Sequence, residues 1–377
     1  KDRVTAEQGK EVADTLWQAY VDVFHKILPQ AVQEHDGTRP YWSSSPSAAR
    51  GITERTDAGD MHYWGVWWGK EPFSSFREHT GRFMSEYGFQ SFPAIKSLKQ
   101  FTIPADWDIQ SEVLRSHQRS SIGNETIAAY MKRHYRDPSD FAAFIYLSQL
   151  LQAEGIKEAI GIHRTSRPRC MGSLYWQLND CWPVASWSGM DYYGRWKALQ
   201  YFVREAFKDI IVVPENKGDL TEIHIVSDKR TPRDATLQLK LHQFDGTVLW
   251  DEERNITLNP LEANKVFSID NALFSGYDKN NIVLETRLLI NSSVVSRNML
   301  YYAPIKDLAL PDPEIRYEVN KHGDEFEISL ICDVLAKNVY LRAPETEGSF
   351  SDNFFDLVPG RPVHVRFRPE KKINELS

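Results

Sequence analysis

The spacing of hydrophobic residues changes along the chain, and the change divides it near residue 209. Before that point, segments with apolar residues four positions apart, such as 12–28, alternate with short apolar runs such as 82–86. Apolar residues at this spacing predict amphipathic helices, and short runs rich in aromatic residues predict strands. Strands that alternate with helices are typical of a parallel sheet of βα units, so an α/β architecture is predicted for the first part.

The first part is predicted to contain the following strands and helices. The strands are 39–45, 61–67, 82–86 and 174–177, and the helices are 12–28, 70–79, 123–135, 139–163 and 196–207. Pro29 is expected to kink the first helix or to separate it from a short last turn, because proline has no N–H and clashes with the preceding turn. The sequence Asp137-Pro138-Ser139 marks the start of the longest helix.

Beyond residue 209, apolar and polar residues alternate with a period of two, which predicts half-buried strands of antiparallel sheets. Asp245-Gly246 stands between two such runs and predicts a hairpin turn. The sequence Pro-Asp-Pro at 311–313 interrupts the alternation, which then resumes. We therefore predict two β-sandwich domains, 210–306 and 307–377, after a first domain that covers residues 1–209.

The composition is that of an ordinary globular protein, with 377 residues, of which 41% are hydrophobic. A net charge of -7 gives no reason to expect a nucleic acid or an anionic membrane surface as a partner. No apolar run approaches the roughly 18 residues of a membrane-spanning helix. The sequence also lacks phosphate-binding loops, nucleophile elbows and metal-ligand spacings, so no cofactor and no metal are predicted.

The three cysteines, Cys170, Cys181 and Cys332, fit neither a zinc site nor a dense disulfide framework. A bridge between Cys170 and Cys181 is one alternative. Buried free thiols are the favoured one, because both residues lie in or near an aromatic strand end.

The strongest candidate for chemistry lies in the sequence GRFMSEYGFQSFP, residues 81–93. Glu86 closes a short apolar run there and is followed by glycine and aromatic residues. In (β/α) barrels, catalytic side chains stand at the carboxyl ends of strands, so a glutamate in this position is placed to react. Taken alone, such a glutamate is expected to cap a turn or pair with an arginine, and the neighbouring motifs are what favour a catalytic role.

Four motifs in order along the chain resemble the second half of the catalytic barrel of glycoside hydrolase family 2, and most closely that of its β-mannosidases. The motifs are RPYWSSSP (39–46), GDMHYWGVWWG (59–69), GRFMSEYGFQSFP (81–93) and GSLYWQLNDCWPVASWSGMDYYGRWKALQYFVREAF (172–207). The run SDNFFDLVPG (351–360) is similar to one in the last domain of β-mannosidases. The resemblance implies the C-terminal half of a (β/α)8 TIM barrel, followed by two immunoglobulin-like β-sandwich domains.

The number of strands agrees with half a barrel. A complete barrel has eight strands in about 250 residues. The first part of this chain is predicted to supply only four strands. By the resemblance these are strands five to eight, and the other half is expected upstream of Lys1. By the resemblance, the chain therefore needs that upstream half of its own barrel.

The resemblance also implies roles for individual residues. Glu86 would be the nucleophile of a retaining glycosidase, and the general acid/base, a glutamate that follows an asparagine in the family, would lie upstream. Trp64 and Trp176 would form walls of the subsite for the terminal sugar. Asp60 and His62 would bind hydroxyl groups or orient the acid/base. A place in the core is the alternative for the tryptophans, and a structural role is an equal alternative for His62.

One dipeptide in the chain repeats the pattern of the family's acid/base. Asn124-Glu125 follows the nucleophile in sequence, whereas the family's acid/base precedes it. We predict instead that Asn124 is the N-cap of a helix and that Glu125 lies in its first turn, where a negative charge suits the helix dipole.

The activity implied by the resemblance is the hydrolysis of terminal non-reducing β-D-mannose residues from oligosaccharides or glycans. A β-galactosidase or β-glucuronidase of the same family is the alternative within the class, and a non-catalytic carbohydrate-binding fragment is the alternative outside it. Without the acid/base, the isolated chain is expected to lack ordinary activity. Its open sheet edges favour aggregation or a homo-oligomer. The resemblance favours an extracytoplasmic compartment, such as the periplasm, or the lysosome.

Overall fold

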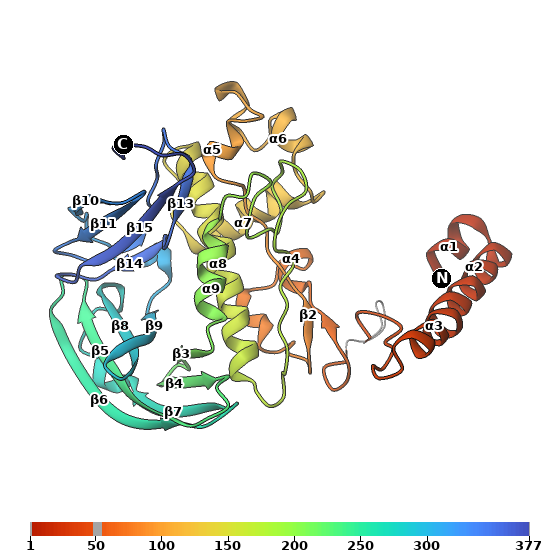
Figure 1. Cartoon of the computed structure of the whole chain (residues 1–377), viewed down its shortest axis with the longest axis horizontal. Coiled ribbons are helices and arrows are strands. Elements are labelled where there is room, and N and C mark those ends of the chain that lie inside the picture. The colour runs from red at the N-terminus through yellow and green to blue at the C-terminus, as the bar shows by residue number, and fades with distance from the viewer. Residues whose placement is uncertain (1, 48–54, 377) are drawn as a thin grey trace.

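The computed structural model describes residues 2–47 and 55–376, and it begins with helices that stand apart from the rest (Figure 1). They are α1 (Asp2–Gln8), α2 (Lys10–Asp22) and α3 (Leu28–His35), and a π-helical turn, η1 (Val23–Ile27), joins α2 to α3. The apolar stripe of α2 is exposed, with Leu16 at 51% and Trp17 at 47%. Pro29 lies in the first turn of α3, where a missing N–H is tolerated, so the helical path continues past it.

Three segments that are far apart in the sequence lie side by side as parallel strands. β1 (Met61–His62) pairs with β2 (Met84–Glu86) in parallel, and Ser173 forms a parallel bridge to Met84. The bridge uses the N–H and C=O of Met84, which point to the edge of β2 away from β1. The segments at Met61, Met84 and Ser173 thus lie side by side in the same order as in the sequence, as the predicted βα units require.

The strands are shorter than predicted, and three of the predictions are corrected here. The described structure has no strand in 39–45, where Trp42 and Ser45 donate hydrogen bonds to the side chain of Asp60 instead of joining a ladder. The strand predicted at 61–67 ends at position 62, because the backbone then winds into the short helix α4 (Gly65–Trp68). The segment 174–177 forms no strand, and only the neighbouring Ser173 is bridged.

The long helices of the first part lie within two residues of their predicted ends. They are α7 (Gly123–His134), α8 (Phe141–Thr165) and α9 (Ala198–Ala206), and α8 packs along α9 (Figure 1). The predicted helix 70–79 is only a single 3-10 turn, η2 (Phe73–Phe76). The short elements α5 (Ile95–Leu98), η3 (Pro104–Asp106) and α6 (Glu112–Ser116) lie between β2 and α7.

The core of this part is aromatic. Trp67, Phe89 and Tyr130 are fully buried. The ring of Phe89 meets Trp67 edge-on at 5.1 Å and Tyr130 at 4.8 Å. Such edge-to-face contacts add to the area that the rings bury. This packing fixes the loops after β1 and β2 relative to α7.

The prediction for Asn124 is wrong, and that for Glu125 is confirmed. The N-cap of α7 is Ile122, and Asn124 lies inside the first turn together with Glu125. The Asn124 side chain is buried, accepts a hydrogen bond from Gln118 Nε2 at 2.7 Å, and donates one to the Ile109 carbonyl at 2.5 Å. Its amide therefore binds the segment before the helix rather than capping it.

The cysteines are free, so the alternative of a Cys170–Cys181 bridge is not realised. Cys170 is buried, as predicted, but the same prediction for Cys181 is wrong, because its side chain is exposed. Cys332, for which burial was not predicted, is buried as well. Burial raises the pKa of the Cys170 and Cys332 thiols. These two side chains therefore act as small apolar groups at neutral pH.

The next part is a β-sandwich of two antiparallel sheets. One sheet has the order β3 (Ile210–Asn216), β4 (Leu220–Ser227), β7 (Ala263–Asp270), and the other β6 (Val248–Leu258), β5 (Arg233–Gln243), β8 (Ile282–Ile290), β9 (Ser293–Tyr301). Alternate residues of both sheets, such as Ile223 and Leu241, meet in one core. The predicted hairpin joins β5 to β6, and Gly246 in its turn has φ +90, which glycine adopts readily.

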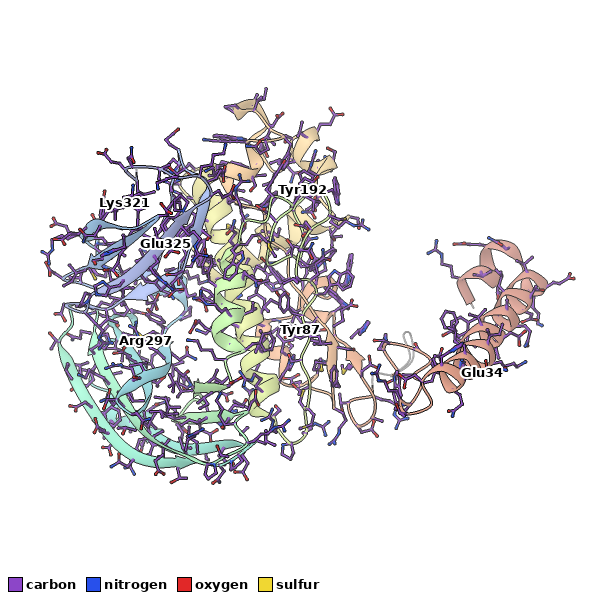
Figure 2. All side chains as sticks on the ribbon, in the orientation of Figure 1. Glu34, Tyr87, Tyr192, Arg297, Lys321 and Glu325 are labelled. Atoms are coloured by element: carbon purple, nitrogen blue, oxygen red, sulfur yellow. The ribbon has the colours of Figure 1, made fainter. Side chains whose placement is uncertain are left out.

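The last part is a smaller sandwich. One sheet has the order β10 (Arg316–His322), β11 (Glu325–Ile331), β15 (Val363–Pro369), β13 (Gly348–Phe350), and the other pairs β12 (Ala336–Val339) with β14 (Phe355–Leu357). Phe326, Leu330 and Phe367 are buried between them. Lys321 and Glu325, labelled in Figure 2, mark the turn between β10 and β11.

Buried charges join the two sandwiches. Glu285 of β8 is 1% exposed, and its carboxylate forms ion pairs with Arg297 of β9 at 2.7 Å and with Arg361 of the smaller sandwich. Arg361 binds it with two N–H groups, the second at 3.0 Å. Nearby, the Tyr301 hydroxyl donates to Asp356 across the same junction at 2.6 Å. The two sandwiches are thus joined through groups that are costly to leave unpaired.

We predict that Glu285→Gln lowers the free energy of unfolding by about 3–5 kcal/mol, because both guanidinium groups would lose their buried counter-charge. Denaturant titration of the two proteins measures the difference. Glu252→Gln, which breaks an exposed pair with Arg254, is the control and is expected to cost at most about 1 kcal/mol. Equal losses in the two variants would contradict the prediction.

The effect of Glu285→Gln depends on pH. Burial acts to raise the pKa of Glu285, but the hydrogen bonds and charges of Arg361 and Arg297 outweigh it and lower the pKa below 4.5. The contribution is therefore present above pH 4.5 and is lost as the pH falls through the pKa of the folded state. The difference between wild type and variant should shrink on acidification below that value.

Candidate active site

Glu86 is the last residue of β2. Its carbonyl still belongs to the sheet, because it accepts a hydrogen bond from the Tyr63 N–H at 3.0 Å. The side chain is mostly buried, at 24% exposed, and Oε1 accepts a hydrogen bond from Trp64 Nε1–H at 2.9 Å. Oε2 lies 3.4 Å from His62 Nδ1. Each oxygen of the carboxylate is thus in contact with a different neighbouring side chain.

The spacing of Asp60, His62 and Trp64 brings them to this carboxylate. Side chains two residues apart in an extended chain project from the same side. The parallel register places His62 opposite Glu86. The structure therefore brings His62 and Trp64 into direct contact with Glu86, whereas Asp60 reaches His62 only through Ser45.

Asp60 is held by neutral donors from two directions. Ser45 Oγ and Ser85 Oγ each donate to it at 2.6 Å, and the Ser47 N–H donates at 2.7 Å. Trp42 Nε1–H lies at 3.3 Å. Partial burial acts to raise the pKa of Asp60, but these hydrogen bonds outweigh it and hold the pKa well below 3.8. Asp60 is therefore ionised at neutral pH.

Ser45 connects Asp60 to His62. A serine has one O–H, and Ser45 donates it to Asp60, so its oxygen accepts from His62 Nε2–H at 3.1 Å. The other ring nitrogen faces Glu86. The four side chains make one continuous polar chain that ends at the Glu86 carboxylate.

Tryptophans stand around the segment that follows Glu86. The ring of Trp64 meets Trp187 edge-on at 5.8 Å, and Trp187 meets the buried Trp67 at the same distance. The side chain of Trp176 is 45% exposed, and its backbone N–H donates a hydrogen bond to the Tyr87 carbonyl at 2.7 Å. Trp67 is thus a core residue, while Trp64 and Trp176 lie at the two sides of the chain after Glu86.

The residues after Glu86 are fixed by close packing. Tyr87, labelled in Figure 2, points to the core, where its ring meets His163 of α8 edge-on at 4.8 Å. A Cβ at Gly88 would lie 2.3 Å from the Trp176 carbonyl and 3.1 Å from the Trp64 ring. Only glycine therefore allows the two tryptophans to approach this backbone.

Several residues of this site were not identified from the sequence motifs. Ser45 and Trp42 belong to RPYWSSSP, whose small polar residues were the only signal. Ser85 precedes the nucleophile candidate, and its role follows from the pairing of β1 with β2. Trp187 lies eleven residues beyond Trp176 and returns to the site through a folded loop. Contacts of this kind depend on tertiary structure.

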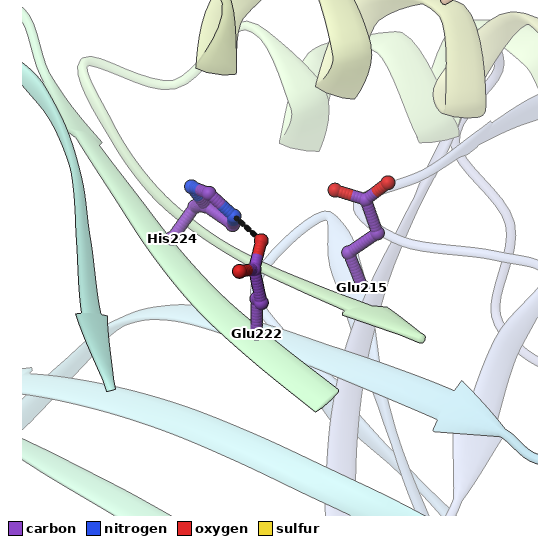
Figure 3. Close-up of side chains that lie close together, drawn as sticks. All are labelled: Glu215, Glu222 and His224. Atoms are coloured by element: carbon purple, nitrogen blue, oxygen red, sulfur yellow. Dashed lines mark hydrogen bonds and ion pairs between the residues drawn. The ribbon is translucent and has the colours of Figure 1, made fainter. Parts of the chain in front are cut away.

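A second cluster of ionisable groups lies on the larger sandwich. Glu215, Glu222 and His224 hold ligand atoms within 4.8 Å of one another (Figure 3). Basic side chains already pair with these carboxylates. Arg77 and Lys217 pair with Glu215, and Lys265 pairs with Glu222. The hydrogen bond from Lys265 is the main cause that lowers the pKa of Glu222. These ion pairs explain why the acidic residues of the cluster lie together, without a bound metal ion.

Comparison with known proteins gives two matches to family models. A model described as "Mannosidase Ig/CBM-like domain" matches residues 220–307, and one described as "Ig-fold domain" matches residues 310–376. The two sandwiches are therefore immunoglobulin-like domains of the kind found in mannosidases.

Longer alignments include the helix–strand part. A β-mannosidase B of Aspergillus fumigatus is 30% identical over 374 residues, which cover 92% of this chain and 43% of that protein. A β-mannosidase of Capra hircus is 28% identical, with 95% of this chain and 44% of that protein covered. The crystal structure of a β-D-mannosidase from Dictyoglomus thermophilum superposes with a TM-score of 0.85 at 29% identity, over 93% of this chain and 43% of that one.

This chain is a relative of the β-mannosidases of glycoside hydrolase family 2. The resemblance inferred from the four motifs is thereby confirmed. The chain spans less than half the length of the β-mannosidases that it matches. An exo-chitosanase from Amycolatopsis orientalis, at 18% identity and a TM-score of 0.67, shares the fold. In the described parts of this β-mannosidase relative, no helix has the length and apolar character needed to cross a membrane.

The close approach at Gly88 gives a testable prediction. Gly88→Ala would force the Trp176 backbone away from the strand end, and we expect a loss of about 1–3 kcal/mol in the free energy of unfolding. The near-ultraviolet circular dichroism of the tryptophans should change as well. Gly276→Ala is the control, because a Cβ there has nothing within 4 Å, and it should change stability by no more than about 0.5 kcal/mol. Identical midpoints for the two variants would refute the packing argument.

Proposed function

We propose that this chain forms the nucleophile-bearing part of a retaining exo-β-mannosidase, which releases terminal β-linked mannose from oligosaccharides or glycans. The supporting observation is the surroundings of Glu86, a strand-end carboxylate whose two oxygens contact Trp64 and His62. The alignment with β-mannosidases over more than nine-tenths of the chain supports the same assignment.

In the proposed reaction, Glu86 attacks the anomeric carbon of the terminal mannose. A bond forms between a carboxylate oxygen and that carbon, the glycosidic C–O bond breaks, and the leaving oxygen takes a proton from a second carboxylic acid. Water then attacks the same carbon, a proton passes to the second carboxylate, and Glu86 is released. The Trp64 N–H would hold one oxygen of Glu86 while the other reacts.

The second carboxylate is proposed to come from a part of the enzyme outside these 377 residues. A retaining glycosidase needs its two carboxyl groups about 5–5.5 Å apart. Asn124-Glu125 is unsuited, since its asparagine binds the segment before α7. The matched β-mannosidases are more than twice as long as the aligned region, which leaves room for that group.

We further propose that residues 1–209 are the second half of a (β/α)8 barrel, followed by the domains 210–306 and 307–377. The parallel order of β1, β2 and Ser173, with helices between them, supports this assignment. So does the exposed apolar surface at Phe83 and Leu174, beside the strands. If the other half of the barrel is missing, such a surface favours self-association of the isolated chain.

Sugar recognition is assigned to the residues that surround Glu86. Trp64 and Trp176 would pack against the apolar faces of the terminal mannose. Asp60 already accepts four hydrogen bonds, so it would orient the acid/base through Ser45 and His62 rather than bind a hydroxyl. His62 would either bind a sugar hydroxyl or orient the acid/base. The β-mannosidase relatives favour mannose over the galactose or glucuronate of other family members. A carboxylate with two polar neighbours also favours catalysis over simple carbohydrate binding.

The decisive experiment traps the covalent intermediate. The enzyme that contains this chain together with the rest of its barrel is incubated with 2-deoxy-2-fluoro-β-mannosyl fluoride and analysed by intact-mass spectrometry and peptide mapping. We expect one label, on Glu86. The fluorine at C2 slows both formation and hydrolysis of the glycosyl-enzyme, while the fluoride leaving group at C1 keeps formation the faster step, so the intermediate accumulates.

Two controls define the outcome. Glu86→Gln should take up no label, and the galactosyl analogue should react much more slowly than the mannosyl one. Labelling by the galactosyl analogue alone would keep the mechanism and change the substrate. If neither analogue labels the protein, the chain is a carbohydrate-binding module and the catalytic proposal fails.

A further inference from the structure

The loop that follows Trp176 folds back on itself. The N–H of Gln177 donates to the Trp187 carbonyl at 3.2 Å, and the N–H of Met190 donates to the Leu178 carbonyl at 2.9 Å. The residues directly after Trp176 are therefore paired with 187–190. Any displacement of 187–190 would move both Trp176 and Trp187, the two tryptophans that this loop contributes near Glu86.

A tight turn ends this loop. Asp191 is buried, its N–H donates to the Arg195 carbonyl at 2.9 Å, and its Oδ1 accepts from the Arg195 N–H at 3.0 Å. Ser97 of the α5 helix donates its hydroxyl to the other carboxylate oxygen. The turn is thus rigid, and the Arg195 side chain extends from it.

Arg195 reaches the smaller sandwich. Its Nη2 and Nε lie 2.8 Å and 3.3 Å from the two carboxylate oxygens of Glu347, and its Nη1 donates to Ser97 Oγ at 3.0 Å. Such two-point contacts between guanidinium and carboxylate fix direction as well as distance. Lys96 of α5 adds a pair with Glu347 at 3.1 Å and a hydrogen bond to the Thr346 carbonyl at 3.0 Å.

We propose that Glu347 is a positioning residue, which acts through Arg195 to hold the paired loop 177–191 and its tryptophans beside Glu86. The smaller sandwich is then a brace for the sugar-facing loop. The contact between α5 and the segment before β13 lies at the face of this sandwich that meets the helix–strand part (Figure 1). The role in sugar binding rests on the proposed function, whereas the mechanical role does not.

The charge state of Glu347 fits this role. Partial burial disfavours its ionised form, but hydrogen bonds from Arg195 and Lys96 outweigh that effect and lower the pKa of Glu347 below 4.5. The brace is therefore intact at neutral pH. The side chains are 44% exposed for Glu347 and 22% for Arg195, so water screens the pair and its share of global stability is small. Its loss should loosen the loop without unfolding the protein.

The chain offers a matched control in Asp352. It lies in the same sandwich with its side chain 39% exposed, and it pairs with Arg204 of the helix–strand part at 2.7 Å. Arg204 belongs to α9 and makes no contact with the loop among those described. Asp352→Asn therefore removes an interdomain ion pair of similar exposure that should not brace the loop.

The test is amide hydrogen exchange, at neutral pH, of the enzyme that contains this chain together with the rest of its barrel. Glu347→Gln should make peptides within 177–191 exchange about two- to fivefold faster, the range that an ion pair of this exposure supports. Peptides of α8 should be unchanged, and Asp352→Asn should leave the loop as in wild type. Arg195→Lys keeps the charge but loses the two-point contact, and it should act in the same direction as Glu347→Gln.

Two results would overturn the proposal: unchanged exchange of the loop in both Glu347→Gln and Arg195→Lys, or equal acceleration in Asp352→Asn. In the complete enzyme, Glu347→Gln should weaken binding of the 2-fluoro-mannosyl reagent and leave the rate of labelling at saturation unchanged. A general structural defect would lower both quantities. If wild type fails to label at all, the proposed function fails, while the exchange result still decides the brace.

Discussion

The geometry of the candidate site depends on the parallel pairing of β1 with β2. The hydrogen bond from the Tyr63 N–H to the Glu86 carbonyl sets the register of the two strands. With that register, Asp60, His62 and Trp64 all project toward the end of β2. A slip by one residue would turn each of these side chains to the opposite face. The site is thus a consequence of backbone pairing as much as of residue type.

Four carboxylates of this protein fall into two chemical groups. Glu285 and Glu347 bind guanidinium groups, which fix them and neutralise their charge. Asp60 is held by hydroxyl and N–H donors, and Glu86 contacts only Trp64 and His62 among the described contacts. A carboxylate without an arginine partner keeps its electron pairs available to react, whereas one bound by arginine does not. This difference separates the candidate nucleophile from the structural acids.

Sequence patterns predicted elements that depend on local spacing. The helices α7, α8 and α9, the hairpin at Asp245-Gly246 and the parallel order of the strands follow from periodicity. The sequence patterns did not predict contacts between residues that are far apart in the sequence. The segment 39–45 is extended but unpaired, because its side chains bond Asp60. Asn124 looks like a cap in sequence, yet tertiary contacts hold it inside the first turn. Trp187 joins the site only because its loop folds back.

The buried junction between the two sandwiches has a practical meaning. Cutting the chain in 302–309, where family models and sheets both change, would leave Glu285 without Arg361 and the Tyr301 hydroxyl without Asp356. Each fragment would then expose charged groups whose partners lie in the other. The two immunoglobulin-like units are therefore separate in topology but mutually dependent in folding, and neither can be transplanted alone as a ready-made module.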